Sequence, residues 1–297
     1  DKCLDRLFSF LEVCIMELAR QKQARIFAAQ IRIETLKALG HLGFGHLGGS
    51  LSIADLLAVL YSGEMKVDPA NPNWEDRDFL VCSKGHAGPA IYATLALRGF
   101  FPKEELLTIN QGGTHLPSHC DHNLTPGIDM TTGSLGQGSS LAVGVAMGKR
   151  ISGKDNTTYL ILGDGEIQEG QVWEAASLAA QQKLSNLIAF VDWNKKQLYG
   201  YISDINDFSN IAERFAAFGW DAVTVDGHDV AAIADAIENA KRLDDGRPHC
   251  IVLDTIKGKG CSFVSDADSN HHVTISAEQL AAGLAELEEE LAKAVAE

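Results

Sequence analysis

The stretch TTYLILGDGEIQEGQ, residues 157–171, places a run of β-forming residues directly before a glycine-rich turn. The apolar first half predicts a buried strand, and the pattern of residues 170–183 predicts the helix that follows. Between them, Gly163 and Gly165 allow the backbone to approach a ligand closely, and the amides that begin the helix can hold a phosphate. Asp164 adds a carboxylate to the same turn. We therefore expect a binding site at the end of this strand.

Strand-like and helix-like patterns alternate from about residue 78 onward. Strands are expected at 78–83, 157–163, 186–192, 221–227 and 249–256, and helices at 22–40, 53–61 (with Ser52 as N-cap), 87–99, 137–153, 170–183, 209–218, 230–243 and 276–296. The strands are apolar on both faces, which is typical of a parallel sheet flanked by helices on both faces, an α/β fold. In such sheets ligands bind beyond the carboxyl ends of the strands.

The composition excludes several classes of protein. The 297-residue chain has a net charge of −15 and no block of Lys or Arg, which argues against a nucleic acid or an anionic membrane as partner. The apolar N-terminal stretch contains Glu12 and Glu17 and has no basic start, so it is not a signal peptide. No uncharged run approaches the ~20 residues of a membrane span. Six scattered cysteines without a CxxC pair (Cys3, Cys14, Cys82, Cys120, Cys250, Cys261) indicate reduced thiols of a cytoplasmic protein.

The chain shows no internal repeat, low-complexity linker or strong domain break. We therefore predict a helical leader over residues 1–21, one α/β domain over residues 22–275 and a C-terminal helix over residues 276–297.

The carboxylate of Asp164 would repel a phosphate unless a divalent cation lies between them. Mg²⁺ takes about six oxygens and is commonly shared between carboxylates and a diphosphate. Asn194 follows the next strand and offers an amide oxygen, and nearby backbone carbonyls can supply another. The alternative is that Asp164 only caps a helix. The order GDG, 28 residues and then Asn194 resembles the signature of proteins that bind thiamine diphosphate.

A wider resemblance covers residues 22–275, which look like the N-terminal, diphosphate-binding half of transketolase. It rests on motifs in the family's order: GHLGGSLS (45–52), LVCSKGHAGPAIY (80–92), LPSHCD (116–121), TTGSLGQG (131–138), GDGEIQEGQVWEA (163–175), VDWNK (191–195), VDGHD (225–229) and KGKG (257–260). The resemblance implies thiamine diphosphate as cofactor, with Mg²⁺ or another divalent cation such as Ca²⁺ or Mn²⁺. The metal would be held by Asp164, Asn194 and the backbone carbonyl of Lys196.

Three histidines of these motifs (His46, His86, His119), together with His271 in NHH, match histidines of the family's active site. Breaking a carbon–carbon bond of a ketose requires a base to take a hydroxyl proton, and a neutral imidazole suits that task. By resemblance, His46 and His271 lie around the donor's reacting hydroxyl, His119 holds the hydroxyl on the first carbon, and His86 binds diphosphate. His271 lacks the family's usual preceding tryptophan, so His272 competes with it for the role. We expect structural or surface roles for the other histidines (His41, His115, His122, His228, His249).

The resemblance assigns further residues to the cofactor. Lys84, Gly165 and Lys257 match positions around the diphosphate and the active-site loop, whereas Gly133, Ser134 and Leu135 match the loop against the cofactor rings. Glu169 and Glu174 match acids of the subunit-interface network near the aminopyrimidine. A solvent-exposed helix face is the alternative for these two glutamates.

The pyrimidine-binding half of transketolase, which carries the activating glutamate, has no counterpart in this sequence. The first hypothesis is the N-terminal subunit of a split transketolase, active with a C-terminal subunit on a separate chain, with two copies of each. It would transfer a two-carbon ketol unit from a ketose or ketose phosphate to an aldose or aldose phosphate. The second hypothesis is a cofactor-binding relic without catalysis.

Other enzymes are alternatives to transketolase. Deoxyxylulose-phosphate synthase and 2-oxoacid dehydrogenase components share the GDG and asparagine site, but a decarboxylase does not need these histidines. A dinucleotide-binding dehydrogenase would need GxGxxG after its first strand and an acid about 20 residues later. GSLGQG (133–138) has the glycines, but no clear strand precedes it and no suitable acid follows.

Overall fold

A parallel sheet forms the centre of the computed structural model, which describes residues 2–243 and 245–297, with side chains from residue 17 onward. Within these residues the sheet has five strands in the order β2-β3-β4-β8-β7, and every neighbouring pair is parallel. The strands are β2 (Phe79–Cys82), β3 (Thr158–Gly163), β4 (Leu187–Trp193), β7 (Asp221–Asp226) and β8 (His249–Asp254). They correspond to the five predicted strands, and the predicted α/β class is confirmed.

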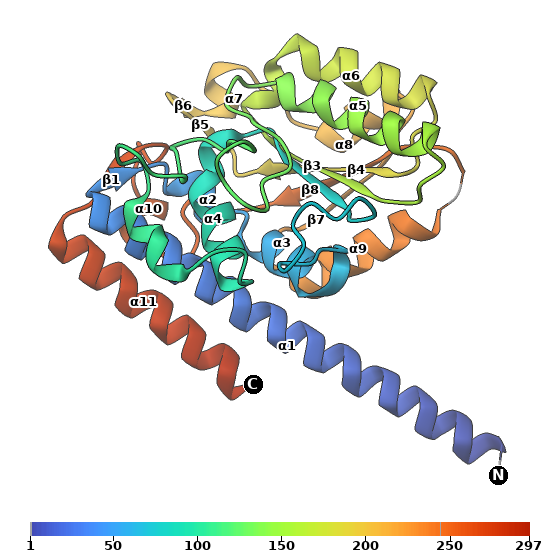
Figure 1. The fold of residues 1–297 in the computed structure, drawn as a ribbon, viewed down its shortest axis with the longest axis horizontal. Helices are drawn as coiled ribbons and strands as arrows, with labels where there is room; N and C mark the ends of the chain where they lie inside the picture. The colour runs from blue at the N-terminus through green and yellow to red at the C-terminus, as the bar shows by residue number, and fades with distance from the viewer. Residues whose placement is uncertain (1, 244) are drawn as a thin grey trace.

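Helices cover both faces of this sheet (Figure 1). One face carries α5 (Gln137–Ile151), α6 (Gly170–Gln181) and α8 (Ile211–Ala217). The other face carries α1 (Lys2–Leu42), α3 (Ala54–Val59), α4 (Gly88–Leu97) and α9 (Val230–Arg242), and α11 (Ala277–Ala296) packs against α1. No helix in the described part of the chain is long and apolar enough to cross a membrane.

Alternate strand residues divide between the two cores. Tyr159 and Ile161 of β3 pack on the side of α1 and α4, whereas Leu160 and Leu162 pack on the side of α5 and α6. This two-residue period explains why the strands are apolar throughout. The edge strand β7 is an exception, because Val223 is 42% exposed; the prediction of strands buried on both faces is wrong there.

The first helix is longer than the predicted helix 22–40. It runs without interruption to Leu42 and ends before Gly43, whose φ of 90° favours glycine. Gly40 lets the C-terminal helix approach, because a Cβ at this position would lie 2.5 Å from Leu280 Cδ1. The C-terminal helix begins with a capping box formed by Ser276 and Gln279. The predicted boundary between a leader and the α/β domain remains a prediction.

Short elements gather at the carboxyl edge of the sheet. They are β1 (Phe44–Gly45) paired with β9 (Val273–Thr274), the hairpin of β5 (Lys196–Gln197) and β6 (Gly200–Tyr201), and the helices α2 (Gly48–Leu51), α7 (Ile202–Ile205) and α10 (Ser262–Ser265). Other turns are a π-helix (Leu60–Glu64) and 3₁₀ turns (Gly85–Ala87, Lys103–Thr108, Glu166–Gln168). Four cysteines, Cys82, Cys120, Cys250 and Cys261, are free and buried, whereas the side chains of Cys3 and Cys14 lie outside the described residues.

Candidate active site

The ends of neighbouring strands lie level at the carboxyl edge of the sheet. Gly163 of β3 pairs with Asp192 of β4 in the parallel register. Asp164 and Asn194 follow these two strands, so the fold brings together two residues that are thirty positions apart in the sequence. This juxtaposition is the one that the spacing of the two motifs predicted.

Asp164 is a buried carboxylate without a cationic partner in hydrogen-bond contact among the described residues. Its two oxygens accept backbone N–H groups, from Gly165 at 2.8 Å and from Lys195 at 2.6 Å. Burial and the charge of Asp192 raise the pKa of Asp164 to about 7, against the opposing effect of Lys257. The first amide of the long helix α6 belongs to Gly170, and Asp164 does not bond it. The helix-cap alternative for Asp164 is therefore not supported.

Asp192 is the centre of a buried network that the sequence motifs did not identify. Its Oδ2 accepts hydrogen bonds from Lys84 Nζ at 2.6 Å, Ser52 Oγ at 2.7 Å and Asn194 Nδ2 at 2.7 Å. Its Oδ1 accepts the hydroxyl of Thr255 at 2.5 Å. Although burial opposes ionisation, Lys84 and these hydrogen bonds hold the pKa of Asp192 below its usual value. Asp192 thereby orients the amide of Asn194 by binding its nitrogen.

The prediction that Ser52 is the N-cap of the helix 53–61 is wrong. The N-cap position of α3 is Ile53, and no side chain caps that helix. The hydroxyl of Ser52 points instead to Asp192. A carboxylate at the end of an apolar run such as NLIAFVD is the signal that could have identified Asp192, because a buried charge needs partners.

Lys257 supplies positive charge beside the residues that were predicted to bind a metal. Its buried ammonium donates to the backbone carbonyl of Lys196 at 2.8 Å and lies 3.4 Å from Nδ1 of His271. Burial is the main reason that the pKa of Lys257 falls to about 8, although Asp164 opposes the shift. The carbonyl predicted to bind the metal therefore already faces a cation here.

A cavity of ≈ 300 Å³ opens at this edge of the sheet. Predicted site residues contribute ten of its lining side chains or backbone groups: Lys84, His86, Leu135, Asp164, Gly165, Glu169, Asn194, Lys196, Lys257 and His271. Gly49 also lines the cavity, and a Cβ there would make only van der Waals contacts, at 3.5 Å from Lys84 Nζ and 3.4 Å from His86 Nε2. The structure thus assembles most of the predicted site around one hollow.

The predicted histidines form one cluster beside the cavity. The ring of His46 lies 5.6 Å from that of His86, 5.4 Å from that of His119 and 5.3 Å from that of His271, centroid to centroid. His272 also belongs to the cluster, at 4.9 Å from His46, but it is exposed and does not line the cavity. Of the two competing residues, His271 is the one that lies against Lys257 and the cavity.

In four histidines of the cluster (His46, His86, His119, His271) the pKa is lowered, which favours the neutral imidazole at physiological pH. Burial, with the neighbouring imidazoles and Lys257, lowers the pKa of His46 to about 4 and that of His271 to about 3. Burial and Lys84 place the pKa of His86 well below its ordinary value, and burial alone lowers that of His119. Neutral imidazoles can accept a proton or hold a hydroxyl, as the proposed chemistry requires.

Some predicted residues lie outside the main cavity. His119, Gly133 and Ser134 line an adjoining open hollow. Glu174 is exposed on α6 and lines a separate shallow hollow, so this chain alone does not bring it to the cavity. Its assignment to the cofactor stays a prediction.

Glu166 is a second buried acid that the sequence motifs did not assign. It accepts the hydroxyl of Ser83, and its two oxygens accept the amides of Gly136 at 2.8 Å and Gly163 at 3.0 Å. These contacts join the end of β3 to Gly136, which directly follows the 133–135 loop that was predicted to lie against the cofactor rings. Glu166 therefore ties that loop to the GDG turn.

The residues of the cavity fit a divalent cation with a diphosphate. The carboxylate of Asp164, the amide oxygen of Asn194 and the carbonyl of Lys196 are the oxygen ligands that Mg²⁺ prefers. Among the described residues no three His, Cys, Asp or Glu side chains are grouped as a metal site. A cation here would need further oxygens, and a diphosphate held near Lys84 and Lys257 can supply them.

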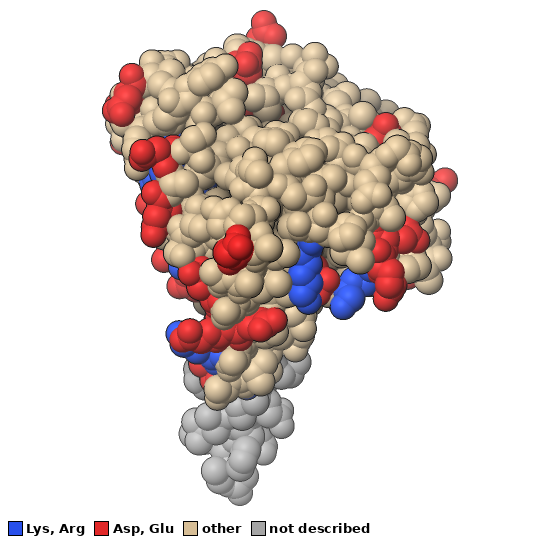
Figure 2. Space-filling view, turned by 90° about the vertical axis from the view of Figure 1, so that its left-hand side faces the viewer, with Lys and Arg blue, Asp and Glu red and all other residues tan. Residues whose placement is uncertain are grey.

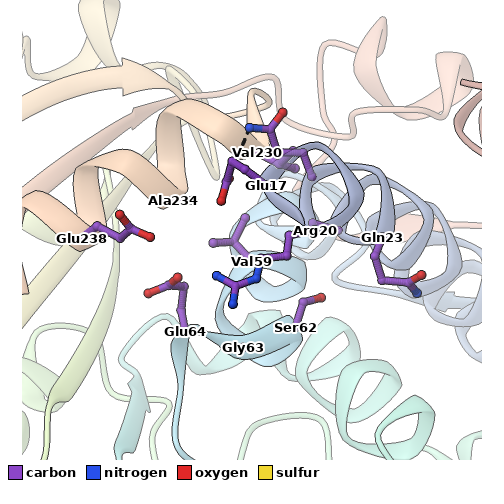
Figure 3. Close-up of a pocket in the computed structure, with 12 residues that line it drawn as sticks. Glu17, Arg20, Gln23, Val59, Ser62, Gly63, Glu64, Val230, Ala234 and Glu238 are labelled. Atoms are coloured by element: carbon purple, nitrogen blue, oxygen red, sulfur yellow. Dashed lines mark hydrogen bonds between the residues drawn. The ribbon is translucent and has the colours of Figure 1, made fainter. Parts of the chain in front are cut away.

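A second cavity, of ≈ 200 Å³, lies among α1, the turn after α3 and α9 (Figure 3). Glu17, Glu64 and Glu238 line it together with Arg20. No predicted site residue belongs to it, and Glu64 already pairs with Lys241 at 2.8 Å.

Fold and cavity together define a thiamine-diphosphate-binding domain of the α/β class, and comparisons with known proteins agree. Residues 23–290 match the transketolase family model described as the thiamine diphosphate binding domain. The 6-deoxy-6-sulfo-D-fructose transketolase subunit SqwG of Clostridium sp. (strain MSTE9) is 52% identical over 270 residues, which cover 91% of this chain and 96% of that protein. One of the subunits of the apulose-4-phosphate transketolase of Phocaeicola vulgatus is 37% identical, over 84% of this chain and 88% of that one.

The crystal structure of transketolase from Campylobacter jejuni superposes with a TM-score of 0.83 at 30% identity. The match covers 92% of this chain and 45% of that one, so the chain spans less than half of the solved enzyme. The chain therefore belongs to the transketolase family and corresponds to its diphosphate-binding part.

Proposed function

We propose that this chain is the N-terminal subunit of a two-chain transketolase. It would transfer a two-carbon ketol unit from a ketose donor to an aldose acceptor, with thiamine diphosphate held through a divalent cation. The observation that carries the proposal is the buried carboxylate of Asp164, beside Asn194 and next to a cluster of neutral histidines. A mere structural turn would not need a buried carboxylate that lacks a cationic partner.

The residues around the cavity would have different roles in this proposal. Asp164, Asn194 and the carbonyl of Lys196 would hold the cation, while Lys84 and His86 would face the diphosphate. Thiamine diphosphate, when bound, supplies the nucleophilic carbon that attacks the ketose carbonyl. His46 and His271 would accept and return the hydroxyl proton of the donor, since their lowered pKa values keep them neutral.

A partner chain is part of the proposal. Two relatives that match along most of their length are named as transketolase subunits. The face that carries β1, β5, β6 and α10 is largely free of charged side chains in its upper half, although the chain has a net charge of −15 (Figure 2). Exposed apolar side chains beside the cavity, Leu135, Leu198 and Tyr199, suit coverage by another protein surface. We propose that the partner is a C-terminal subunit, in a complex of two copies of each chain, located in the cytoplasm.

The donor would be a ketose with an anionic group at its far end. The relative with 52% identity is named for 6-deoxy-6-sulfo-D-fructose, whereas the second is named for a sugar phosphate. We propose the sulfonated ketose as the first donor to test and ketose phosphates as the second.

The experiment measures binding and transfer separately. Calorimetry with thiamine diphosphate should show binding in Mg²⁺ and none in EDTA. Ketol transfer from 6-deoxy-6-sulfofructose, fructose 6-phosphate and unmodified fructose should then be followed with the chain alone, with the candidate partner alone and with both. Turnover only in the mixture, together with a mass of two copies of each chain by light scattering, is the expected result.

Full turnover by the isolated chain would contradict the need for a partner. Cofactor binding without turnover in any mixture would favour the inactive relic, and absence of metal-dependent binding would contradict the proposed site.

A further inference from the structure

His228, in the VDGHD loop between β7 and α9, bridges two separate parts of the molecule. Its Nε2 accepts the backbone N–H of Ile256 at 2.9 Å. Its Nδ1 lies 2.7 Å from Oδ2 of Asp55 in α3. Because Nε2 accepts a hydrogen bond it carries no proton, so the neutral ring donates from Nδ1 to Asp55.

The other residues of the loop place this imidazole. Gly227 allows the loop to approach the end of β8, because a Cβ there would lie 2.9 Å from the Cβ of Leu253. The carboxylate of Asp226 accepts the amide of His228 at 2.8 Å, and Asp229 caps α9 by accepting the amide of Ala231 at 2.9 Å. The sequence DGHD thus gives each residue a separate contact, and the histidine is the one that reaches the neighbouring loop.

A buried ion network holds the other side of the imidazole. Asp55 pairs with the fully buried guanidinium of Arg32 in α1, and Arg32 Nη1 also donates to Glu290 of α11 at 3.2 Å. Burial would raise the pKa of Asp55, but Arg32 and the hydrogen bond from His228 outweigh it and hold the pKa below its usual value. Asp55 is therefore an ionised acceptor, anchored to two helices, that fixes the ring of His228.

The segment held by His228 leads directly into the cavity. Ile256 precedes Lys257, whose ammonium contacts the carbonyl of Lys196 at 2.8 Å. The residue after Lys257 is Gly258, and its amide donates to the carbonyl of Gly48 at 3.0 Å. Lys257 therefore lies between two backbone anchors, and His228 provides the first of them.

We propose that His228 is a positioning residue for cofactor binding, which acts by holding the backbone at Ile256 so that Lys257 enters the cavity. This inference rests on the proposed function, because Lys257 is taken to face the diphosphate. It assigns to the VDGHD loop a role beyond the structural one expected from the sequence.

Two substitutions separate the two bonds of the imidazole. In His228→Asn the amide nitrogen can replace Nδ1 and keep the contact to Asp55, but the side chain is too short to reach Ile256. In His228→Gln the amide oxygen can replace Nε2 and accept from Ile256, but the donor to Asp55 is lost. Outer contacts of this kind typically change metal affinity by about 10–100-fold. We expect His228→Asn to weaken Mg²⁺-dependent binding of thiamine diphosphate about tenfold or more, and His228→Gln to stay within about threefold of the natural protein.

The order of stabilities should be the reverse of the order of affinities. His228→Gln leaves the buried carboxylate of Asp55 with one partner fewer, so it should unfold at a lower temperature than His228→Asn. A purely structural role would make affinity follow stability. Hydrogen exchange in the ligand-free chain gives a second readout: peptides containing residues 255–261 should exchange faster in His228→Asn alone, with the 137–151 helix as an unchanged internal control.

Unchanged affinity and unchanged exchange in His228→Asn would overturn the positioning role, and so would a larger loss of affinity in His228→Gln than in His228→Asn. If His228→Gln does not fold, His228→Asn against the natural chain still decides the question by affinity and exchange. If the natural chain does not bind thiamine diphosphate, the proposed function fails, while the exchange experiment still tests whether His228 holds the 255–261 segment.

Discussion

The two walls of the cavity are built in different ways. The strand-end wall has Lys84, Asp164 and Asn194 at the cavity and Asp192 buried behind them, and short hydrogen bonds join Lys84 and Asn194 to Asp192. The histidine wall is the cluster of His46, His86, His119 and His271, of which His86 and His271 line the cavity. The ring centroids of this cluster lie between 4.6 and 5.6 Å apart. The first wall is fixed before a ligand arrives, as suits charge binding. The second keeps unprotonated nitrogens for a substrate.

The largest effect on the strand-end wall is expected from a substitution of Asp164. Replacing Asp164 with Ala should reduce metal-dependent binding of thiamine diphosphate by more than the roughly 10–100-fold loss typical of outer-shell partners, because a ligand of the cation itself is removed. Calorimetry in Mg²⁺ and in EDTA measures this change. Asp235→Ala, an exposed substitution on α9, is the matched control and should bind normally. Binding by Asp164→Ala that is undiminished and insensitive to EDTA would show that the strand-end wall does not hold a metal.

Substitutions in the histidine wall should mainly lower the rate of ketol transfer. Replacing His46 with Ala should lower kcat of the complete enzyme by about 10²–10⁴-fold, the usual contribution of a general acid or base, with little change in cofactor affinity. Replacing His119, which would hold a hydroxyl of the donor, should also lower kcat more than cofactor affinity. Replacing His86 should mainly weaken the cofactor. His122→Ala, on the exposed surface, serves as the control. Equal losses of cofactor affinity in the His46, His86 and His119 variants would mean that the roles are assigned wrongly.

Asp192 tests whether the strand-end wall is preorganised. Asp192→Asn should weaken cofactor binding about 10–100-fold, because the amide of Asn194 loses its orientation. It should also lower the free energy of unfolding by about 3–5 kcal/mol, because Lys84 is left as an uncompensated buried charge. Adding Lys84→Met should recover part of the stability but not the affinity, as measured by urea unfolding and calorimetry. Normal affinity in Asp192→Asn would remove the positioning role of Asp192.

The smallest effect is expected from pH. A histidine with an ordinary pKa near 6.5 would be neutral in only roughly a quarter of molecules at pH 6. The pKa values of about 4 for His46 and about 3 for His271 lie below this range, and activity is lost only as the pH falls through them. With saturating cofactor, kcat should therefore change less than about twofold between pH 8 and pH 6 on account of these residues. An acidic limb near pH 6.5 that disappears in His46→Asn would contradict the lowered pKa of His46.

Sequence patterns were sufficient to predict the elements in which the pattern continues over many residues. The strands β3 and β4, six and seven residues long, are mostly apolar, and the helices beside them repeat at three and four, so their place in a parallel sheet follows from burial on both faces. The two-residue strands β5 and β9 carry no such period, and the exposed edge strand β7 does not obey the rule of the central strands.

The sequence also predicted the motif residues that the structure gathers at the cavity, because the proposed metal, diphosphate and sugar hydroxyl would each require particular side chains at strand ends and in loops. Asp192 and Glu166 were not assigned, although both are buried acids at this site. Their roles depend on which amides, hydroxyls and ammonium groups the neighbouring loops bring within 3 Å, and residue type alone does not contain that information.

The sequence by itself determined the α/β class, and it predicted that Asp164 and Asn194 lie at neighbouring strand ends and that four histidines gather nearby. Only the tertiary structure decided that Asp192 orients Asn194, that His271 rather than His272 lines the cavity, and that His228 joins Asp55 to the Lys257 segment. The physical reason is the range of the interactions. Strand and helix periods depend on neighbours along the chain, whereas a hydrogen bond between residues 173 positions apart, such as His228 and Asp55, exists only after the helices and the sheet have packed.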